Sequence, residues 1–443
     1  MQKLVVKGRQ TLSGVLPVSG SKNTALPLMA AAILGGGRAA ITFVPDLKDV
    51  GTFARVIRFT GVDAELDAAS GTMNIDASNL ATPEAPYELV KRMRASFYMM
   101  GALLGRCGQA RVSLPGGCAW GPRPVNLHVD GFRALGASVE LDKGYVVARA
   151  PGGRLRGGTF RMEPSSVGAT VNLLLGAATA AGATRLENAA CEPDVVVFGE
   201  YLSAMGARIS GLGTATIEVE GVDALYPADF KNCPDRIELG TFMVAAALAG
   251  QPGVPVSITG GRADHLGDAF IDALDRTGAR AEYSSDVIRV AAPEQIQPVS
   301  VTTAIYPGFP TDLQAQWTVL MTQANGNAKI TDEVYTDRFK HIPELRRMGL
   351  NAIVVDNEVV VEGGTRLSGA YVMSTDLRAS VSLVLAGLIA DGETHVQRIY
   401  HLDRGYEDLE GKLAAAGARI ERVTYDEFAD PELEEASRGA AEA

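Results

Sequence analysis

Apolar and polar positions follow a pattern that repeats about every 70 residues along the chain. Amphipathic helical stretches, such as residues 125–135 and 268–277, end at glycines that lie 68 to 75 residues apart. Glycine suits the left-handed turn that ends a helix. Short β-type segments follow most of these glycines. The glycines are Gly61, Gly136, Gly206, Gly278, Gly349 and Gly417. This periodicity predicts six copies of one structural unit.

A second feature recurs in step with the first. A short polar or charged anchor opens a helical stretch rich in Ala and Gly, which a glycine and a β-branched strand then follow. The anchors are Ser21-Lys22-Asn23, Arg94-Ala95-Ser96, Ser165-Ser166-Val167-Gly168, Pro234-Asp235-Arg236, Pro310-Thr311-Asp312 and Thr375-Asp376-Leu377-Arg378. Stretches 173–181, 242–249 and 380–390 are apolar nearly all round, which is typical of helices buried on every side. Buried helices walled by sheets predict an α/β fold of the inside-out barrel type.

The anchors also carry candidate chemistry, because each stands where a buried helix begins. The first turn of a helix presents unpaired N–H groups and a partial positive charge, so several helix starts around one cleft would bind an anion. For the Ser, Thr and Asp anchors, simple capping of the helix is an equally good interpretation. Lys22, Arg94 and Arg378 favour an anion, since a cation at a helix start opposes the dipole unless an anion lies between them.

One thiol lies in a setting unlike the others. Cys118 falls in segment 114–124, LPGGCAWGPRP, which is too rich in Gly and Pro for a helix or a strand. A loop position five residues before Arg123 can lower a thiol pKa from ~8.5 and keep the sulfur accessible. We interpret Cys118 as a catalytic thiol on a mobile lid. An inert thiol is the interpretation for the remaining cysteines, Cys107, Cys191 and Cys233.

Two further charged positions allow two interpretations each. Asp312 follows Pro310 at a helix start, where it either caps the helix or faces the cations as a general base. Arg404 lies in the charged segment 398–407, which is either a solvated ion-pair surface or the source of an arginine clamp for carboxylate or phosphate. His128 lies within a helical stretch, and we interpret it as structural.

Composition and charge narrow the class of protein. A chain of 443 residues with 47% hydrophobic content suits a compact enzyme, and a formal charge of -11 argues against a general nucleic-acid-binding surface. No apolar run reaches the roughly 20 residues of a membrane span, and the N-terminus lacks the regions of a signal peptide. The cysteines show neither CxxC spacing nor histidines at the intervals typical of metal ligands. Lys22 lacks the preceding GxxxxG of a nucleotide-binding P-loop. We therefore expect a cytoplasmic protein with free thiols and without metal, cofactor or membrane contact.

Five ordered motifs carry a family resemblance. They are Ser19-Gly20-Ser21-Lys22-Asn23, the 114–124 loop, Pro234-Asp235-Arg236-Ile237-Glu238, Phe309-Pro310-Thr311-Asp312 and Asp403-Arg404-Gly405-Tyr406-Glu407. Together they resemble the UDP-N-acetylglucosamine 1-carboxyvinyltransferase family of enolpyruvyl transferases, from about residue 1 to residue 424. The resemblance implies two domains of three units each, residues 21–236 and residues 1–20 with 237–424. The acidic tail, residues 425–443, lies outside it and is predicted to be disordered.

The resemblance also implies a reaction and its residues. The family transfers the enolpyruvyl group of phosphoenolpyruvate to the 3-hydroxyl of UDP-N-acetylglucosamine, releases phosphate and so begins peptidoglycan synthesis. Cys118 would add covalently to the donor and serve as acid or product-release group, and Asp312 would be the base for the hydroxyl. Lys22, Arg123 and Arg404 would bind the donor, with Asn23 and Arg378 nearby. The positions that match nucleotide-sugar contacts are Arg94, Arg123, Pro124, Val125, Asn126, Leu127, Ser166, Val167, Gly168 and Val334.

The chain departs from the family pattern at three positions, and two other functions remain as alternatives. Pro164 stands where lysine is common, Asn126 where aspartate is common and Ser21 where alanine is common. A 5-enolpyruvylshikimate-3-phosphate synthase would share the six-unit plan and the donor, but that family lacks a cysteine lid like the one around Cys118. A non-catalytic metabolite-binding protein of the same fold is the second alternative.

Overall fold

Six small sheets of one design build the molecule. In a computed structural model, residues 1–91, 93–115 and 125–426 are described, and within them the strands form six four-stranded sheets. In each sheet one outer strand is parallel to its neighbour, whereas the other two pairs of neighbouring strands are antiparallel. The predicted sixfold repeat is therefore confirmed at the level of strand pairing.

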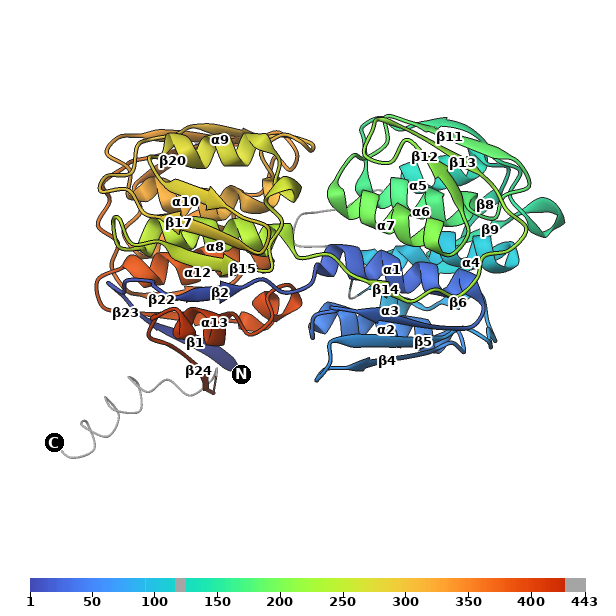
Figure 1. Cartoon of the computed structure of the whole chain (residues 1–443), viewed down its shortest axis with the longest axis horizontal. Helices are drawn as coiled ribbons and strands as arrows, with labels where there is room; N and C mark the ends of the chain where they lie inside the picture. Colours follow the sequence, from blue (N-terminus) through green and yellow to red (C-terminus); the bar gives the residue numbers. More distant parts are fainter. Residues whose placement is uncertain (92, 116–124, 427–443) are drawn as a thin grey trace.

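The sheets divide between two lobes that lie side by side (Figure 1). The first lobe holds the sheets β14-β3-β5-β4 (Phe230–Lys231, Arg38–Thr42, Thr72–Asp76, Asp63–Asp67), β6-β7-β9-β8 (Glu84–Ala85, Gln109–Ser113, Tyr145–Arg149, Ser138–Asp142) and β10-β11-β13-β12 (Gly158–Arg161, Ala183–Glu187, Thr216–Glu220, Arg208–Ser210). The second lobe holds β16-β17-β15-β2 (Arg280–Tyr283, Val287–Ala291, Val256–Thr259, Val15–Pro17), β18-β19-β21-β20 (Val301–Thr303, Ala328–Asp332, Glu358–Val361, Ala352–Val355) and β22-β23-β1-β24 (Tyr371–Met373, Glu393–Gln397, Gln2–Lys7, Ile420–Thr424).

The N-terminal strand completes the last unit of the repeat. In five sheets a hairpin supplies the two strands farthest from the parallel pair, but in the sixth one of these places belongs to β1, which pairs with both β23 and β24. The chain thus begins in the second lobe, crosses to the first near Gly20 and returns near Pro234, where those two residues form an isolated bridge. Domain boundaries at residues 20/21 and 236/237 stay predictions.

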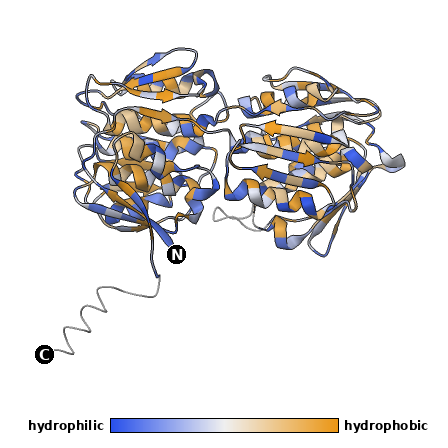
Figure 2. Ribbon diagram, turned by 60° about the horizontal axis from the view of Figure 1, so that its bottom comes forward, coloured by the Kyte–Doolittle hydropathy of each residue, from blue (hydrophilic) through white to orange (hydrophobic). Residues whose placement is uncertain are grey.

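Each lobe encloses helices that are covered on all sides. The inner helices are α1 (Lys22–Gly35), α4 (Met99–Cys107) and α6 (Val167–Ala177) in the first lobe, and α8 (Arg236–Ala249), α10 (Gln314–Thr322) and α12 (Leu377–Ile389) in the second. In α6 every residue from Ala169 to Ala177 is buried, and in α10 every residue is buried. Figure 2 shows hydrophobic residues gathered on these inner elements, so the predicted inside-out α/β architecture is confirmed.

Amphipathic helices and short helical turns complete the outside. The outer helices are α2 (Lys48–Phe59), α3 (Tyr87–Val90), α5 (Asn126–Ala134), α7 (Pro193–Ala204), α9 (Asp268–Arg276), α11 (His341–Arg347) and α13 (Leu409–Ala415). Five 3₁₀ turns join them in the described part of the chain: η1 (Arg94–Tyr98), η2 (Pro151–Gly153), η3 (Ala263–His265), η4 (Thr311–Leu313) and η5 (Ile399–Arg404). Among the described residues, no helix is both long and apolar enough to cross a membrane.

Small residues let the inner helices approach closely. A Cβ added at Gly101 of α4 would overlap the backbone oxygen of Asn172 in α6. The Asn172 side chain accepts a hydrogen bond from the Gly101 N–H at 2.7 Å and donates to the Phe97 carbonyl at 2.9 Å. A polar residue can lie in this core because both of its amide atoms are paired.

Candidate functional site

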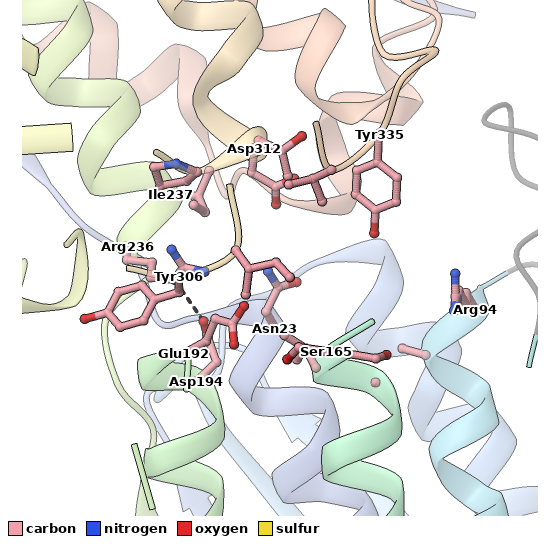
Figure 3. Close-up of a pocket in the computed structure, with 18 of the residues that line it drawn as sticks. Asn23, Arg94, Ser165, Glu192, Asp194, Arg236, Ile237, Tyr306, Asp312 and Tyr335 are labelled. Atoms are coloured by element: carbon pink, nitrogen blue, oxygen red, sulfur yellow. Dashed lines mark hydrogen bonds and ion pairs between the residues drawn. The ribbon is translucent and has the colours of Figure 1, made fainter. Parts of the chain in front are cut away.

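A cavity of about 410 Å³ lies where the two lobes face each other. The first lobe contributes the starts of α1, α6 and α7 and the turn η1, while the second contributes the start of α8, the turn η4 and the segments 304–310 and 334–338. Figure 3 shows Asp312 and Tyr335 extending from the second lobe toward Asn23, Ser165 and Glu192 of the first. Of the residues predicted from the sequence, those that line the cavity are Asn23, Arg94, Ser166, Val167, Gly168, Asp312 and Val334.

The start of α6 provides an anion-binding environment at one wall. Ser166 is the N-cap, and its hydroxyl accepts a hydrogen bond from the Ala169 N–H at 3.3 Å. The cap therefore pairs with one of the backbone N–H groups in the first turn that have no partner within the helix. The partial positive charge of this helix end remains directed at the cavity. Arg94, at the start of η1, lines the same cavity. Helix dipole and guanidinium together suit a negatively charged ligand here.

Asp312 is held between two arginines. Nη2 of Arg338 lies 2.6 Å from one carboxylate oxygen, and Nη2 of Arg378 donates to the other at 2.8 Å. Burial by itself would raise the pKa of Asp312, but Arg378 and Arg338 outweigh it and hold that pKa well below its usual range. Asp312 is therefore ionised at neutral pH, as a proton acceptor must be. Arg378, predicted to lie near the donor, is absent from the cavity lining and touches the site through Asp312.

Lys22 and Arg404, the predicted donor-binding cations, do not line the cavity. Both pair with Asp49, a residue that was not predicted from the sequence. Lys22 Nζ lies 3.2 Å from one oxygen of Asp49, and Arg404 Nε donates to the other at 2.9 Å. Lys22 begins α1 in the first lobe, whereas Arg404 ends η5 in the second. Asp49 lies in the first turn of α2, and no motif around it singles it out.

A second ion pair joins the lobes at the cavity itself. Nε of Arg236, at the start of α8, donates to Asp194 of α7 at 3.0 Å, as Figure 3 shows. The other oxygen of Asp194 accepts from the hydroxyls of Ser21 at 2.9 Å and Thr24 at 2.7 Å. Ser21 also caps α1, so the serine found in place of the usual alanine ties α1 to this pair. Ser21 and Arg236 both belong to anchors predicted from the sequence, whereas no motif marked Asp194.

Glu192 is a further cavity residue that no sequence motif marked. It is 8% exposed, and within the described part of the molecule one of its carboxylate oxygens has no hydrogen-bond partner. Burial raises the pKa of Glu192 above its usual value, and the nearby charge of Arg236 only partly offsets this effect. The cavity therefore holds two carboxylates whose pKa is lowered, Asp312 and Asp194, and one, Glu192, that gains a proton more easily.

The predicted segment at the start of α5 lies beside the cavity. Val125 and Leu127 are partly buried against the first core, Asn126 is exposed, and none of the three lines the cavity. His128 does line it, although it is buried and its Nδ1 lies 2.9 Å from the Asn172 amide nitrogen. Burial, aided by Arg94, lowers the pKa of His128 to about 3, so the ring is neutral.

Three predicted residues lie outside the described part of the chain: Cys118, Arg123 and Pro124. The other thiols are free, with Cys107 exposed, Cys191 partly buried and Cys233 buried. Burial raises the pKa of all three, to about 12 for Cys233. A raised pKa disfavours the nucleophilic thiolate. Within the described residues no three His, Cys, Asp or Glu side chains are grouped so that they could hold a metal ion.

Comparison with known proteins agrees with the fold and with the resemblance. The family model of EPSP synthase (3-phosphoshikimate 1-carboxyvinyltransferase) matches residues 6–413. The UDP-N-acetylglucosamine 1-carboxyvinyltransferase of Chloroherpeton thalassium is 51% identical over 434 residues, which are 98% of this chain and 100% of that protein. The protein of the same name from Azorhizobium caulinodans is 49% identical over 433 residues, 96% of this chain and 100% of its own length.

Solved structures extend the comparison to three dimensions. The enolpyruvyl transferase NikO from Streptomyces tendae superimposes with a TM-score of 0.85 at 30% identity, covering 96% of this chain and 99% of that one. An EPSP synthase from Acinetobacter baumannii gives a TM-score of 0.73 at 18% identity, over 96% of this chain and 100% of that one, and at that identity shows the shared fold alone. The chain belongs to the EPSP synthase family of enolpyruvyl transferases, and within it to the UDP-N-acetylglucosamine 1-carboxyvinyltransferases.

Proposed function

We propose that this enzyme transfers the enolpyruvyl group of phosphoenolpyruvate to the 3-hydroxyl of UDP-N-acetylglucosamine and releases phosphate. The observation that carries the proposal is the ionised carboxylate of Asp312 in a cavity that a helix start and arginines also line. Such a cavity suits an acceptor that combines hydroxyl groups with a diphosphate. The 51% identity with a full-length relative of that name supports the choice of acceptor.

The acceptor would lie along the wall formed by the starts of α1 and α6. Its diphosphate would take the N–H groups of Ser166, Val167 and Gly168 together with Arg94, and its sugar would lie toward Asn23 and Asp312. Val334 would contact the nucleotide from the second lobe. Arg123, Pro124, Val125, Asn126 and Leu127, carried over from the family, complete the proposed nucleotide contacts.

The donor would be bound by cations from both lobes. Lys22 and Arg404 already lie within reach of one carboxylate, Asp49, and so present their charges to a common point. Phosphoenolpyruvate carries a phosphate and a carboxylate, which match an ammonium and a guanidinium group. Arg123 and Arg378 would add charge at the edges of the same anion. Their combined field would stabilise the negative charge that develops in the transition state.

The chemistry follows from these positions. The 3-hydroxyl oxygen bonds to C2 of phosphoenolpyruvate, Asp312 accepts the hydroxyl proton and C3 receives a proton from an acid, the role proposed for Cys118. The resulting tetrahedral intermediate then loses a proton from C3 and expels phosphate from C2, which restores the double bond. The low pKa of Asp312 makes it a weak base, so proton removal would accompany bond formation rather than precede it.

The remaining expectations belong to the same proposal. The enzyme would act in the cytoplasm on two small molecules, with no need for nucleic acid, membrane or cofactor. Its product would feed peptidoglycan synthesis, and thereby cell shape and division. Use of shikimate 3-phosphate as acceptor is the alternative that the description of the family model favours.

Phosphate release distinguishes these functions. The purified enzyme would be mixed with phosphoenolpyruvate and either UDP-N-acetylglucosamine or shikimate 3-phosphate, beside a Cys118→Ala variant. We expect release that depends on the nucleotide sugar and falls in the variant. Release only with shikimate 3-phosphate would assign the alternative acceptor, and release with neither acceptor would contradict both transferase functions.

A further inference from the structure

Asp49 lies between the two cations that are proposed to bind the donor. Its side chain is 7% exposed, in the first turn of α2, where the helix dipole favours an anion. One oxygen faces Lys22 Nζ at 3.2 Å, and the other accepts a hydrogen bond from Arg404 Nε at 2.9 Å. Nη2 of Arg404 lies 3.5 Å from the first oxygen as well. A single buried carboxylate thus joins cations from the two lobes.

The charge of Asp49 is secure in this setting. Burial would raise its pKa, but Lys22 and Arg404 outweigh burial and hold the pKa below its usual value. Two cations and one carboxylate leave a net charge of about one positive unit at this point. Because the carboxylate interacts with the same N–H groups that would bind the donor, it competes with an incoming phosphate for them.

We propose that Asp49 is a positioning residue of the donor site: it holds Lys22 and Arg404 in a fixed relative geometry and limits their affinity for anions. This inference rests on the proposed function of those two cations. Without Asp49, two like charges brought together from different lobes would repel each other and lose their fixed relative geometry until an anion binds between them. The carboxylate keeps them paired before the donor arrives, and it weakens the retention of the phosphate product afterwards.

The Asp49→Asn variant separates positioning from a general structural role. It keeps the size of the side chain and one acceptor oxygen but removes the negative charge. We expect the affinity for inorganic phosphate to rise by about three- to tenfold. Without the carboxylate, the two buried positive charges of Lys22 and Arg404 are no longer neutralised in part and attract the anion more strongly. We also expect the KM for phosphoenolpyruvate to fall and kcat to fall about tenfold, since the cations are less well positioned. The KM for UDP-N-acetylglucosamine should stay within about twofold of the wild-type value, because Asp49 does not line the acceptor cavity.

A matched control removes a different contact between the lobes. Lys48, the residue before Asp49, forms its own ion pair between the lobes, with Asp403 at 2.7 Å. The Lys48→Met variant should therefore leave phosphate affinity and the KM for phosphoenolpyruvate unchanged.

An Asp49→Glu variant keeps the charge, so its phosphate affinity should match that of the wild type while its kcat falls. It also provides the test if Asp49→Asn does not fold.

Phosphate binding measured by calorimetry, beside steady-state kinetics with both substrates, decides the inference. Tighter phosphate binding in Asp49→Asn, or unchanged binding with lower kcat in Asp49→Glu, would support it. Unchanged or weaker phosphate binding in a folded Asp49→Asn, tighter binding in Asp49→Glu, or the same changes in Lys48→Met would overturn it. The wild type tests the proposed function separately: absence of phosphate release that depends on the nucleotide sugar would contradict that function, whereas the calorimetry of phosphate would still test Asp49.

Discussion

Nη2 of Arg338 lies 2.6 Å from Oδ1 of Asp312 at the wall of the inter-lobe cavity. The guanidinium is nearly buried and belongs to the segment that follows β19, whereas Asp312 belongs to η4. Arg378 and Arg338 together hold the pKa of Asp312 well below its usual range, in a place where burial alone would raise it. That pKa therefore sets the lower pH limit of a reaction that uses Asp312 as base.

The Arg338→Gln variant should move that limit upward. The loss of one cation raises the pKa of Asp312 toward its ordinary value, so the carboxylate becomes protonated at a higher pH than in the wild type. We expect the acidic limb of the kcat/KM profile to shift up by about one pH unit. Arg346→Gln is the control, since Arg346 hydrogen-bonds the Ala352 carbonyl on the outside of the same lobe. A limb that does not move would remove Asp312 from the role of base.

Ser166 should contribute to both helix stability and acceptor binding, and two variants separate the contributions. Ser166→Ala loses the cap and should destabilise the first lobe by ~1 kcal/mol, whereas Ser166→Gly should cost only a few tenths of that. Both variants remove the hydroxyl from the cavity, so both should raise the KM for UDP-N-acetylglucosamine several-fold. Thermal unfolding and steady-state kinetics measure the two effects. A normal KM in both variants would place the acceptor elsewhere.

Because the inner helices pack closely, alanine should affect stability differently at two glycines, one on an inner helix and one on an outer helix. Gly101→Ala would drive a methyl group into the backbone of α6 and should destabilise the protein by roughly 2–3 kcal/mol. Gly51→Ala is the matched control, because a Cβ there meets nothing within 4 Å and alanine stabilises an exposed helix by up to ~1 kcal/mol. Urea unfolding should show the midpoint falling for the first variant and unchanged or higher for the second. Equal effects would contradict the close approach of α4 and α6.

His128 should make stability depend on pH. The folded ring takes up a proton only near pH 3, whereas the unfolded chain takes one up near pH 6.5, so acid favours the unfolded state. The contribution of the neutral ring is complete above pH 6.5 and is lost as the pH falls, by at most ~1.4 kcal/mol per pH unit. His128→Gln should flatten the dependence of the unfolding midpoint between pH 6.5 and 5. His341→Gln should flatten it similarly, because burial also lowers the pKa of His341 to about 3. An unchanged slope in His128→Gln would show that the ring takes up a proton in the folded protein as readily as in the unfolded chain.

Local pattern was enough to predict the repeated unit. Helix starts at the anchors, glycines at the helix ends and the all-round apolar character of the inner helices depend on neighbouring residues and on the 3.6-residue period, which a sequence displays directly. Asn23, Ser166 and Asp312 could be proposed for the same reason, since each lies at a helix start inside a motif.

Partners far apart in the chain depended on the tertiary structure. Asp49 lies 355 residues from Arg404, Arg236 lies 42 residues from Asp194, and β1 pairs with β24 from the other end of the chain. Glu192 and Asp49 resemble ordinary surface acids in the sequence, but in the structure burial raises the pKa of Glu192, whereas Lys22 and Arg404 outweigh burial and lower the pKa of Asp49. The sequence by itself determined the unit and its helix starts, because those arise from local interactions. The pairing of charges across the cleft was decided by the tertiary structure, because Coulomb energy and desolvation depend on distance and burial in space rather than on separation along the chain.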